Sequence, residues 1–276
     1  AFAQPFAQIE AAERWGLDIV WLAEIHMNPT RSLLSAPLTA ASAIAARGRL
    51  VSGIGRSAFP LAYDAYGISY QESQDRFAES LEIIRRAWTS EVCSHRGVYW
   101  KFENFTLVPR PLQVPHPPIR IAASQPETYG AIGALGYPLF SALRASPMDA
   151  LAANVRAYRE AWRAAGHPGQ GEAHLQVPVY VAATAVQAME EAREGLMRFA
   201  TYRADLLRGP LTYEAVLQQK GIVGTPDMVV ARIADLQETA GLDVISAEIN
   251  VGSLLRHAQV MESLRLYCLE VMPRFK

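Results

Sequence analysis

The sequence predicts an α/β protein whose strands run parallel, arranged either as a barrel or as a doubly wound sheet. Segments with strand-like and helix-like character alternate along the chain, which is typical of repeated βα units. The stretch IVWLA (19–23) is continuously apolar, as expected for a strand that is buried on both faces. No low-complexity linker and no shift of composition divides the 276 residues, so we expect one domain over residues 1–276.

The first half of the chain contains the clearest helix and a hairpin. In the clearest helix, apolar residues recur on one face and charged residues fill the other. The predicted elements are a strand at 17–23, an Ala-rich helix at 33–47, a strand at 49–55, the amphipathic helix at 71–88 and a hairpin at 94–109 that turns at Arg96-Gly97.

The second half repeats the strand and helix order and ends in a complete capped unit. Thr225 is expected to cap a helix that Pro226 opens and Gly241 closes. The other predicted elements are a strand at 115–124, a helix that begins at Pro126, a strand at 137–143, a helix at 149–166, a strand at 177–183 and a final strand at 244–250. This gives six strands, whereas a closed (β/α)₈ barrel needs eight.

Composition and charge exclude several classes of function. The formal net charge is −1 and Lys and Arg form no run, so neither nucleic acid nor an acidic membrane is an expected partner. The two cysteines, Cys93 and Cys268, are too few for a disulfide framework, and a cytoplasmic location is expected. We find no signal peptide, no apolar run that could span a bilayer, and no His or Cys spacing that predicts a metal site.

The strand predicted at 17–23 is followed by two titratable side chains, Glu24 and His26. Residues two apart in a strand point to the same side. A carboxylate and an imidazole there can hold a ligand, orient each other or move protons. They are equally consistent with a structural ion pair at Glu24 and a loop cap at His26. Glu248 and Asn250 end the last strand in a similar way and predict either pocket lining or ion pairs at a barrel rim.

The strand at 49–55 is followed by Arg56. The stretch GIGRSA (53–58) matches the G-x-G-x-x-A pattern of dinucleotide-binding folds, but that pattern requires a helix directly after it, and Pro60 and Gly67 intervene. A Gly-rich turn explains the glycines. It leaves Arg56 as a cation at the C-terminal end of a strand, where α/β folds bind ligands.

A third strand ends at AASQPET (122–128), where a helix opens with polar residues. Ser124, Gln125 and Thr128 can donate hydrogen bonds there, and a helix N-terminus attracts anions, phosphate especially. An ordinary capped helix start is the alternative. Arg56 supplies the positive charge that this helix start lacks, so the two segments together favour anion binding.

Several segments, taken in order, resemble bacterial luciferase-like flavin-dependent monooxygenases. The segments are GLDIVWLAEIHM, GRLVSGIGRS, ESQDRFAESLEIIRRAWTSE, GVYWKFENFTLVPRPLQVPHPPIRIAASQPET, LGYPLF and VGTPDMVVARIADL. The run from RFAESLEII to HPPIRIAAS is the most specific part. The resemblance implies a (β/α)₈ TIM barrel of the luciferase-like type that binds flavin mononucleotide (FMN) at the C-terminal ends of its strands. The family also includes enzymes that use the deazaflavin coenzyme F420.

The resemblance also assigns cofactor-binding residues. Arg56 falls on the family's arginine at the flavin phosphate. Ser124, Gln125 and Thr128 fall on the loop and helix start that hold the same phosphate, and Glu24 falls on the acid of a Glu-His-His motif at the flavin ring.

Two substitutions depart from the family pattern. The motif often continues as Glu-His-His-Phe, and here the first histidine is Ile25, which leaves His26 as the catalytic candidate beside Glu24. Luciferase carries a cysteine before the phosphate arginine, and this chain has Gly55.

Parts of the family barrel have no counterpart in this sequence. The family has a first strand before PFAQIEAAERWG, a further strand and helix between Arg47 and Gly48, and a variable helical stretch between Arg208 and Gly209. We therefore expect chain gaps after Arg47 and near Arg208, which would also explain the low strand count. A genuinely shortened variant is the alternative.

The resemblance implies a two-component monooxygenase that uses reduced FMN and O₂ to oxidise a small organic substrate, which the sequence does not identify. Such an enzyme receives reduced flavin from a separate flavin reductase, and family members are commonly homodimers. Two alternatives stay open. One is an F420-dependent oxidoreductase that moves hydride without oxygen. The other is a non-catalytic flavin-binding protein of the non-fluorescent flavoprotein type.

Overall fold

The computed structural model describes most of the chain, and this part divides into two compact units. The described residues are 3–23, 47–57, 60–123, 125–143, 148–201 and 209–276. Unit 1 comprises Ala1–Val20 and Ala123–Lys276, and unit 2 comprises Trp21–Ala122. Both units combine helices with parallel strands.

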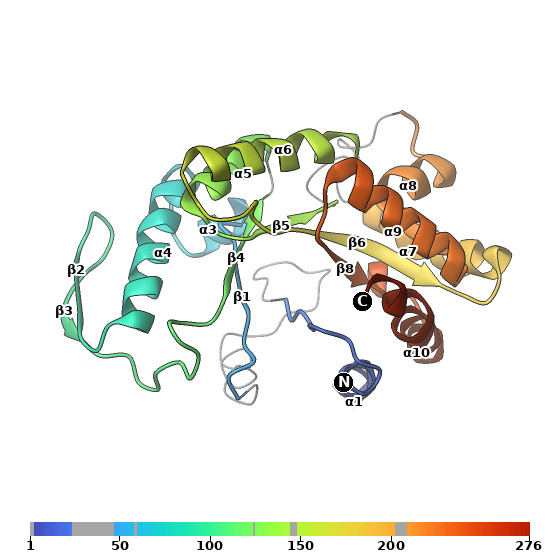
Figure 1. Cartoon of the computed structure of the whole chain (residues 1–276), viewed down its shortest axis with the longest axis horizontal. Helices are drawn as coiled ribbons and strands as arrows, with labels where there is room; N and C mark the ends of the chain where they lie inside the picture. The colour runs from blue at the N-terminus through green and yellow to red at the C-terminus, as the bar shows by residue number, and fades with distance from the viewer. Residues whose placement is uncertain (1–2, 24–46, 58–59, 124, 144–147, 202–208) are drawn as a thin grey trace. The chain divides into compact units, whose positions relative to one another are not determined.

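Unit 2 is built on a pair of parallel strands, a long helix and a hairpin (Figure 1). β1 (Ser52–Ile54) pairs with β4 (Ile119–Ala123), with Ser52 opposite Ile119 and Ile54 opposite Ile121. Because the pair is parallel, both strands end at the same edge. The intervening elements are α3 (Pro60–Ala65), the 3₁₀ turn η1 (Tyr70–Glu72), α4 (Ser73–Thr89), and an antiparallel hairpin of β2 (Cys93–Arg96) and β3 (Lys101–Phe105).

One carboxylate joins α4 to the hairpin. Oε1 of Glu79 lies 2.9 Å from Nε2 of His95, and the Glu79 carboxylate accepts hydrogen bonds from the backbone amides of Val98, Tyr99 and Trp100 at 3.0–3.1 Å. Burial of Glu79 opposes its ionisation, but these hydrogen bonds outweigh that effect and hold the pKa of the carboxyl below its usual value. The ionised carboxylate therefore anchors the turn of the hairpin to the helix.

Unit 1 is built around the long strand β6 (Ala173–Val181). β6 pairs in parallel with β5 (Leu139–Ala142), with β8 (Val244–Glu248) and, along its last residues, with β7 (Ile222–Gly224). The helices of this unit are α1 (Ala3–Arg14), α5 (Pro126–Leu135), α6 (Met148–Ala164), α7 (Ala185–Thr201), α8 (Tyr213–Lys220), α9 (Pro226–Ala240) and α10 (His257–Leu266), with short helical turns η3 (Val251–Ser253), η4 (Tyr267–Val271) and η5 (Met272–Phe275).

Helix boundaries in unit 1 follow from capping residues. α9 begins after Thr225, whose hydroxyl accepts a hydrogen bond from the Met228 amide at 3.4 Å, and Pro226 occupies the first turn. It ends at Gly241, whose backbone is left-handed with φ of 66°. α5 likewise begins at Pro126. Proline suits the first helical turn and glycine the left-handed cap, so the sequence predicted these boundaries.

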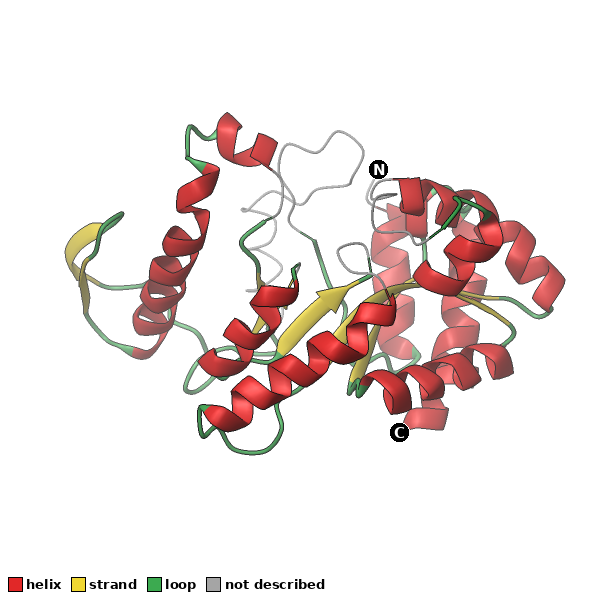
Figure 2. Ribbon diagram, turned by 90° about the horizontal axis from the view of Figure 1, so that it is seen from above, coloured by secondary structure: helices red, strands yellow, loops and turns green. Residues whose placement is uncertain are grey.

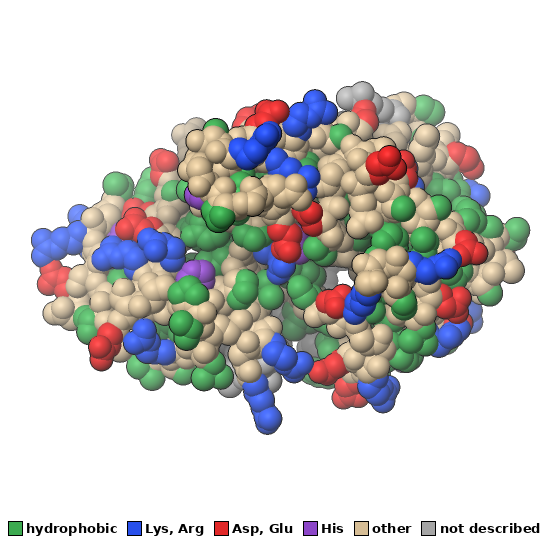
Figure 3. Space-filling model, viewed as in Figure 1, with side chains coloured by type: hydrophobic (Ala, Val, Ile, Leu, Met, Phe, Trp, Pro, Cys, Tyr) green, Lys and Arg blue, Asp and Glu red, His purple; other side chains and the backbone are tan. Residues whose placement is uncertain are grey.

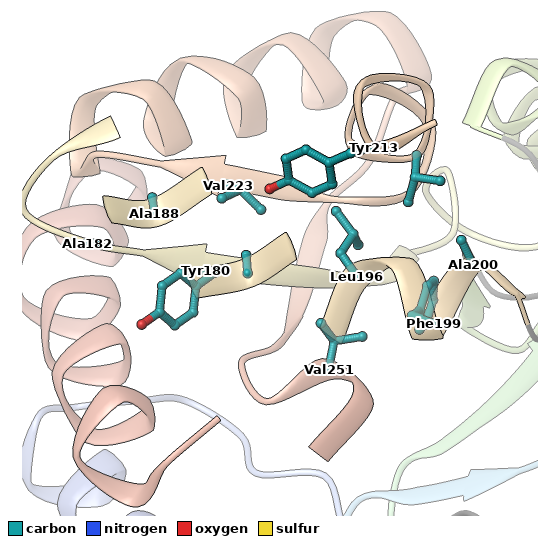
Figure 4. Close-up of a cluster of buried hydrophobic side chains, with 11 residues drawn as sticks. Tyr180, Ala182, Ala188, Leu196, Phe199, Ala200, Tyr213, Val223 and Val251 are labelled. Carbon is teal, nitrogen blue, oxygen red and sulfur yellow. The ribbon is translucent and has the colours of Figure 1, made fainter. Parts of the chain in front are cut away.

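A core of apolar side chains lies between β6, β7, α7 and α8 (Figure 4). Ala188 and Leu196 of α7 and Val216 of α8 are fully buried, and they pack with Tyr180 of β6 and Val223 of β7. Removing such side chains from water is the dominant favourable contribution to folding, at about 25 cal/mol for each Å² of apolar surface. This core therefore holds α7 and α8 on the sheet of unit 1.

The predicted α/β class with parallel strands is confirmed, whereas a closed eight-stranded barrel is not shown. In the described residues, six strands have parallel partners and two form the hairpin. The confirmed elements are β1, α4, the β2–β3 hairpin, β4, α5, β5, α6, β6, α9 and β8. The predicted helix at 33–47 lies outside the described residues except for its last residue.

The strand predicted at 17–23 is wrong. No strand is assigned there, and Val20 and Leu22 are 40% and 41% exposed. Trp21 instead lies with its ring against Gly53 of β1, where an added Cβ would come within 2.8 Å of the ring. An apolar run forms a strand only where a neighbouring strand supplies hydrogen bonds, and in the described residues none pairs with this segment.

The predicted chain gaps stay predictions. Arg47 and Gly48 form a turn in which both residues have positive φ, of 48° and 82°. Residues 202–208, including Arg208, lie outside the described part of the chain.

Surface charge, the cysteines and the length of the helices relate to the classes of function that composition excluded. On the face shown in Figure 3, Lys and Arg side chains are interspersed with Asp and Glu. Both cysteines are buried and free. Within the described residues, we find no helix with the length and apolar character that crossing a membrane requires.

Helices α5 and α6 lie side by side (Figures 1 and 2), and their closest approach involves a glycine. A Cβ added to Gly133 of α5 would lie 2.1 Å from the backbone carbonyl oxygen of Tyr158 in α6. Only a residue without a side chain permits this approach. Gly130, one turn earlier in the same helix, has open space around it.

We predict opposite effects for alanine at these two glycines. Gly133→Ala should lower the free energy of unfolding by about 1–3 kcal/mol, because the methyl group must push the helices apart. Gly130→Ala should leave it unchanged or raise it by up to about 1 kcal/mol, because alanine is the better helix former. Urea unfolding of both variants measures the difference. Equal effects at the two positions would contradict the close approach of α5 and α6.

A second prediction concerns the pH dependence of stability through Glu79. Because its pKa is lower in the folded protein than the usual 4.5, Glu79 stabilises the fold above that value, and the contribution is lost as pH falls through the folded pKa. Glu79→Gln should therefore be less stable than the parent protein at pH 7, and the difference should shrink as pH falls below 4.5. Urea midpoints across this range test the prediction. A difference that does not shrink as pH falls below 4.5 would contradict a role for the carboxylate charge.

Candidate cofactor-binding site

The edge where β1 and β4 end carries one side of the candidate site. Gly55 directly follows β1, and a Cβ added to it would lie 3.2 Å from the Cβ of Ala122 in β4. The two strands therefore stay in close contact one residue beyond Ile54. A side chain at position 55 would require Ala122 to shift by a few tenths of an ångström.

Arg56 follows at this edge and is half-buried. Its Nη1 donates a hydrogen bond to Oγ of Ser73 at 2.7 Å, and its Cζ lies 5.2 Å from the centroid of the Tyr70 ring, within the range of a cation–π interaction. The hydroxyl of Tyr63 donates to the backbone carbonyl of Arg56. Among the described residues, no carboxylate pairs with Arg56, so its charge is not neutralised there.

Gln125 and Thr128 form the start of α5 in unit 1. The Thr128 hydroxyl donates to the carbonyl oxygen of Gln125 at 2.6 Å and lies 3.4 Å from the Gln125 amide. The Gln125 side chain is exposed. These contacts form the capped helix start that was the alternative to an anion site, and they leave the Gln125 side chain accessible at it.

The remaining predicted site residues lie outside the described part of the chain. These are Glu24, His26 and Ser124, together with Ile25. Arg56 belongs to unit 2, and Gln125 and Thr128 belong to unit 1. The meeting of these side chains around one ligand therefore stays a prediction.

The polar residues at the end of β8 have local partners. Nε2 of Gln176, on β6, donates to Oε2 of Glu248 at 3.1 Å, and Oδ1 of Asn250 accepts from the Leu255 amide at 3.1 Å. These bonds tie β8 to β6 and order the turn that follows. They favour a structural role for both residues over pocket lining.

Sequence reasoning missed the residues that surround Arg56. Tyr63, Tyr70 and Ser73 come from α3, η1 and the first residue of α4. Their only signal in the sequence is polar and aromatic residues between a strand and a strong helix, which does not show that they fold back on the arginine. In the described residues, no group of three His, Cys, Asp or Glu side chains could hold a metal ion.

Comparison with known proteins identifies the family. A model of the luciferase-like monooxygenase family matches residues 46–243, which is more than half of the chain. The oxygenase component of a flavin-dependent trigonelline monooxygenase from Acinetobacter baylyi is 34% identical over 88 residues, or 31% of this chain and 24% of that protein. An F420-dependent hydroxymycolic acid dehydrogenase from Mycobacterium tuberculosis is 33% identical over 108 residues, or 36% of this chain and 29% of that protein.

Solved structures agree with this assignment. The monooxygenase RslO1 from Streptomyces bottropensis has a TM-score of 0.74 and 29% identity, over 88% of this chain and 75% of that one. The oxygenating constituent of 3,6-diketocamphane monooxygenase from Pseudomonas putida, solved with FMN, has a TM-score of 0.71 and 22% identity, over 99% and 84%, which shows the shared fold. The chain spans less than a third of the length of the two curated relatives named above. These matches confirm the resemblance that the sequence predicted to flavin-linked oxidoreductases, and the chain belongs to the luciferase-like monooxygenase family.

Proposed function

We propose that the protein is the oxygenase of a two-component flavin-dependent monooxygenase. In this proposal it binds reduced FMN, uses O₂ and oxidises a small organic substrate. Family membership and the oxygenase-component relative support the reaction class. The bound flavin would supply the redox chemistry, by reacting with O₂ and passing one oxygen atom to the substrate.

The cofactor part of the proposal rests on the contacts of Arg56, which include no carboxylate among the described residues. A guanidinium that is half-buried and has no carboxylate partner among the described residues is suited to an anion. Arginine binds phosphate with several N–H donors held in a fixed plane. Arg56 also lies past the C-terminal end of a parallel strand, where ligands bind in α/β folds.

The other site residues complete the proposal. Ser124, Gln125 and Thr128 would hold the phosphate from the start of α5, and Glu24 would border the flavin ring. His26 would hold or move a proton near the substrate, because Ile25 replaces the family's first histidine with a side chain that cannot titrate. The protein would also exclude water from the ring and orient the substrate.

The partners follow from the same reaction class. A separate flavin reductase would supply reduced FMN, in keeping with the relative that is named as an oxygenase component. A homodimer and a cytoplasmic location belong to the proposal as properties of the family resemblance.

The second candidate is an F420-dependent oxidoreductase that moves hydride and needs no oxygen. The F420-dependent relative favours it. A phosphate-linked deazaflavin would use the same anion site, so Arg56 supports both candidates equally. A non-catalytic flavin-binding protein is the third, and the isoleucine at position 25 is the observation in its favour.

We predict that Arg56→Ala weakens FMN binding by about 1.5–3 kcal/mol, the usual worth of a hydrogen bond to a charged group. Riboflavin, which lacks the phosphate, should bind both proteins equally. Fluorescence titration of the two flavins measures the effect. Arg96→Ala is the control, because the Arg96 side chain is 80% exposed and pairs with Glu103 of the hairpin. Unchanged FMN affinity in Arg56→Ala would contradict the phosphate site.

We further predict that His26→Ala lowers the rate of substrate oxidation by about 10²–10⁴-fold, the usual range for a general acid or base, with little change in FMN affinity. The assay mixes the reduced-FMN complex with oxygenated buffer and follows oxygen consumption and product. Hydride transfer between F420 and a substrate, without oxygen consumption, would favour the second candidate. Tight flavin binding with neither reaction would favour the third.

A further inference from the structure

Two arginines of unit 2 are held in contrasting ways. Arg76, on α4, lies 4.2 Å from the ring centroid of Tyr99 and pairs with the Glu72 carboxylate at 2.8 Å. Arg56 also lies over an aromatic ring, that of Tyr70, but its hydrogen-bond partner is the hydroxyl of Ser73. The contacts of Arg76 neutralise its charge, whereas the described contacts of Arg56 fix the guanidinium and leave its charge in place.

Ser73 is fitted to fix one end of that guanidinium. It is 2% exposed and is the first residue of the 17-residue helix α4, so its backbone is held by the helix. Its Oγ accepts the 2.7 Å hydrogen bond from Nη1 of Arg56. A serine hydroxyl carries no charge and accepts a single guanidinium N–H. The positive charge and the other N–H donors of the guanidinium then stay available to an anion.

Two tyrosines hold the rest of the residue. The Tyr70 ring lies against the guanidinium, and the Tyr63 ring meets Tyr70 edge-on, with centroids 5.2 Å apart. The Tyr63 hydroxyl donates to the backbone carbonyl of Arg56. Both the main chain and the side chain of Arg56 are therefore restrained by neighbours from the segment that follows it.

We propose that Ser73 and Tyr70 are positioning residues that pre-orient Arg56 for the cofactor phosphate. This inference rests on the proposed function. A free arginine side chain loses up to about 2 kcal/mol of conformational entropy when it is ordered. Where the folded protein has already restrained the side chain, binding does not have to supply that cost, and affinity for the phosphate rises.

The test compares affinities for FMN and riboflavin in variants of the 276-residue chain. Ser73→Ala should weaken FMN binding by about 5–10-fold, in line with the usual worth of one hydrogen bond. Tyr70→Leu should weaken it by about 3–10-fold through loss of the ring. Tyr70→Phe keeps the ring and should change FMN affinity by less than about 2-fold. Riboflavin affinity should be unchanged throughout, because it has no phosphate for Arg56 to meet.

Ser141→Ala is the matched control. Ser141 is 1% exposed and donates a hydrogen bond of 2.7 Å to the carbonyl of His174, so the variant also removes a buried serine hydroxyl. It should lower stability in urea without changing the ratio of FMN to riboflavin affinity. If Ser73→Ala fails to fold, the two Tyr70 variants still decide, since they keep the serine.

Three results separate the failure of the positioning role from the failure of the phosphate site. If Arg56→Ala lowers FMN affinity selectively while Ser73→Ala and Tyr70→Leu do not, the positioning role is overturned and the phosphate site stands. Equal weakening of FMN and riboflavin in these variants would likewise overturn it, because a general disturbance of the fold does not distinguish the phosphate. If Arg56→Ala itself has no effect, the phosphate site of the proposed function fails.

Discussion

The parallel pairing of β1 with β4 is the constraint on which the candidate site depends. Because the strands run in the same direction, the segments that follow them leave from one edge. The close contact of Gly55 with Ala122 keeps the two backbones together up to the residue before Arg56. In sequence, the chain that continues from β4 is the segment assigned to the phosphate.

Around that edge, the arrangement of charge decides which ligand the protein suits. A half-buried cation loses hydration, and pairing with a carboxylate is the usual compensation. Arg76 has such a partner in Glu72. Among the described residues, Arg56 has no carboxylate partner. The Ser73 hydroxyl and the Tyr70 ring restrain Arg56 without neutralising its positive charge. A bound phosphate would form an ion pair with Arg56. Because it would bind only the folded protein, it would also stabilise this region.

Local signals made much of the fold predictable, and non-local contacts explain the errors. Pro126, Thr225 and Gly241 mark their helix ends because capping depends on neighbours within a few residues. The strand predicted at 17–23 does not form, because a strand needs a neighbouring strand to pair with, and the local pattern of residues does not show whether one is present. The same division holds in the site. The position of Arg56 after a strand was predictable, whereas the return of Tyr70 and Ser73 to its side chain required the fold.

The proposed anchor and the proposed chemistry lie in different parts of the sequence, and this limits what binding alone can decide. In the proposal, Arg56 and its neighbours hold a phosphate, and all three candidate functions, including the non-catalytic flavin-binding protein, would use that site in the same way. The family resemblance assigns Glu24, Ile25 and His26 to the ring and the substrate, where the three candidate functions would differ. Binding of a phosphate-bearing flavin or deazaflavin is therefore expected of each candidate, and a distinction between them must come from the reactions in which residues 24–26 are proposed to take part. The isoleucine at position 25 is the one change in that motif that alters proton chemistry, because it removes a titratable group while leaving the neighbouring acid and imidazole.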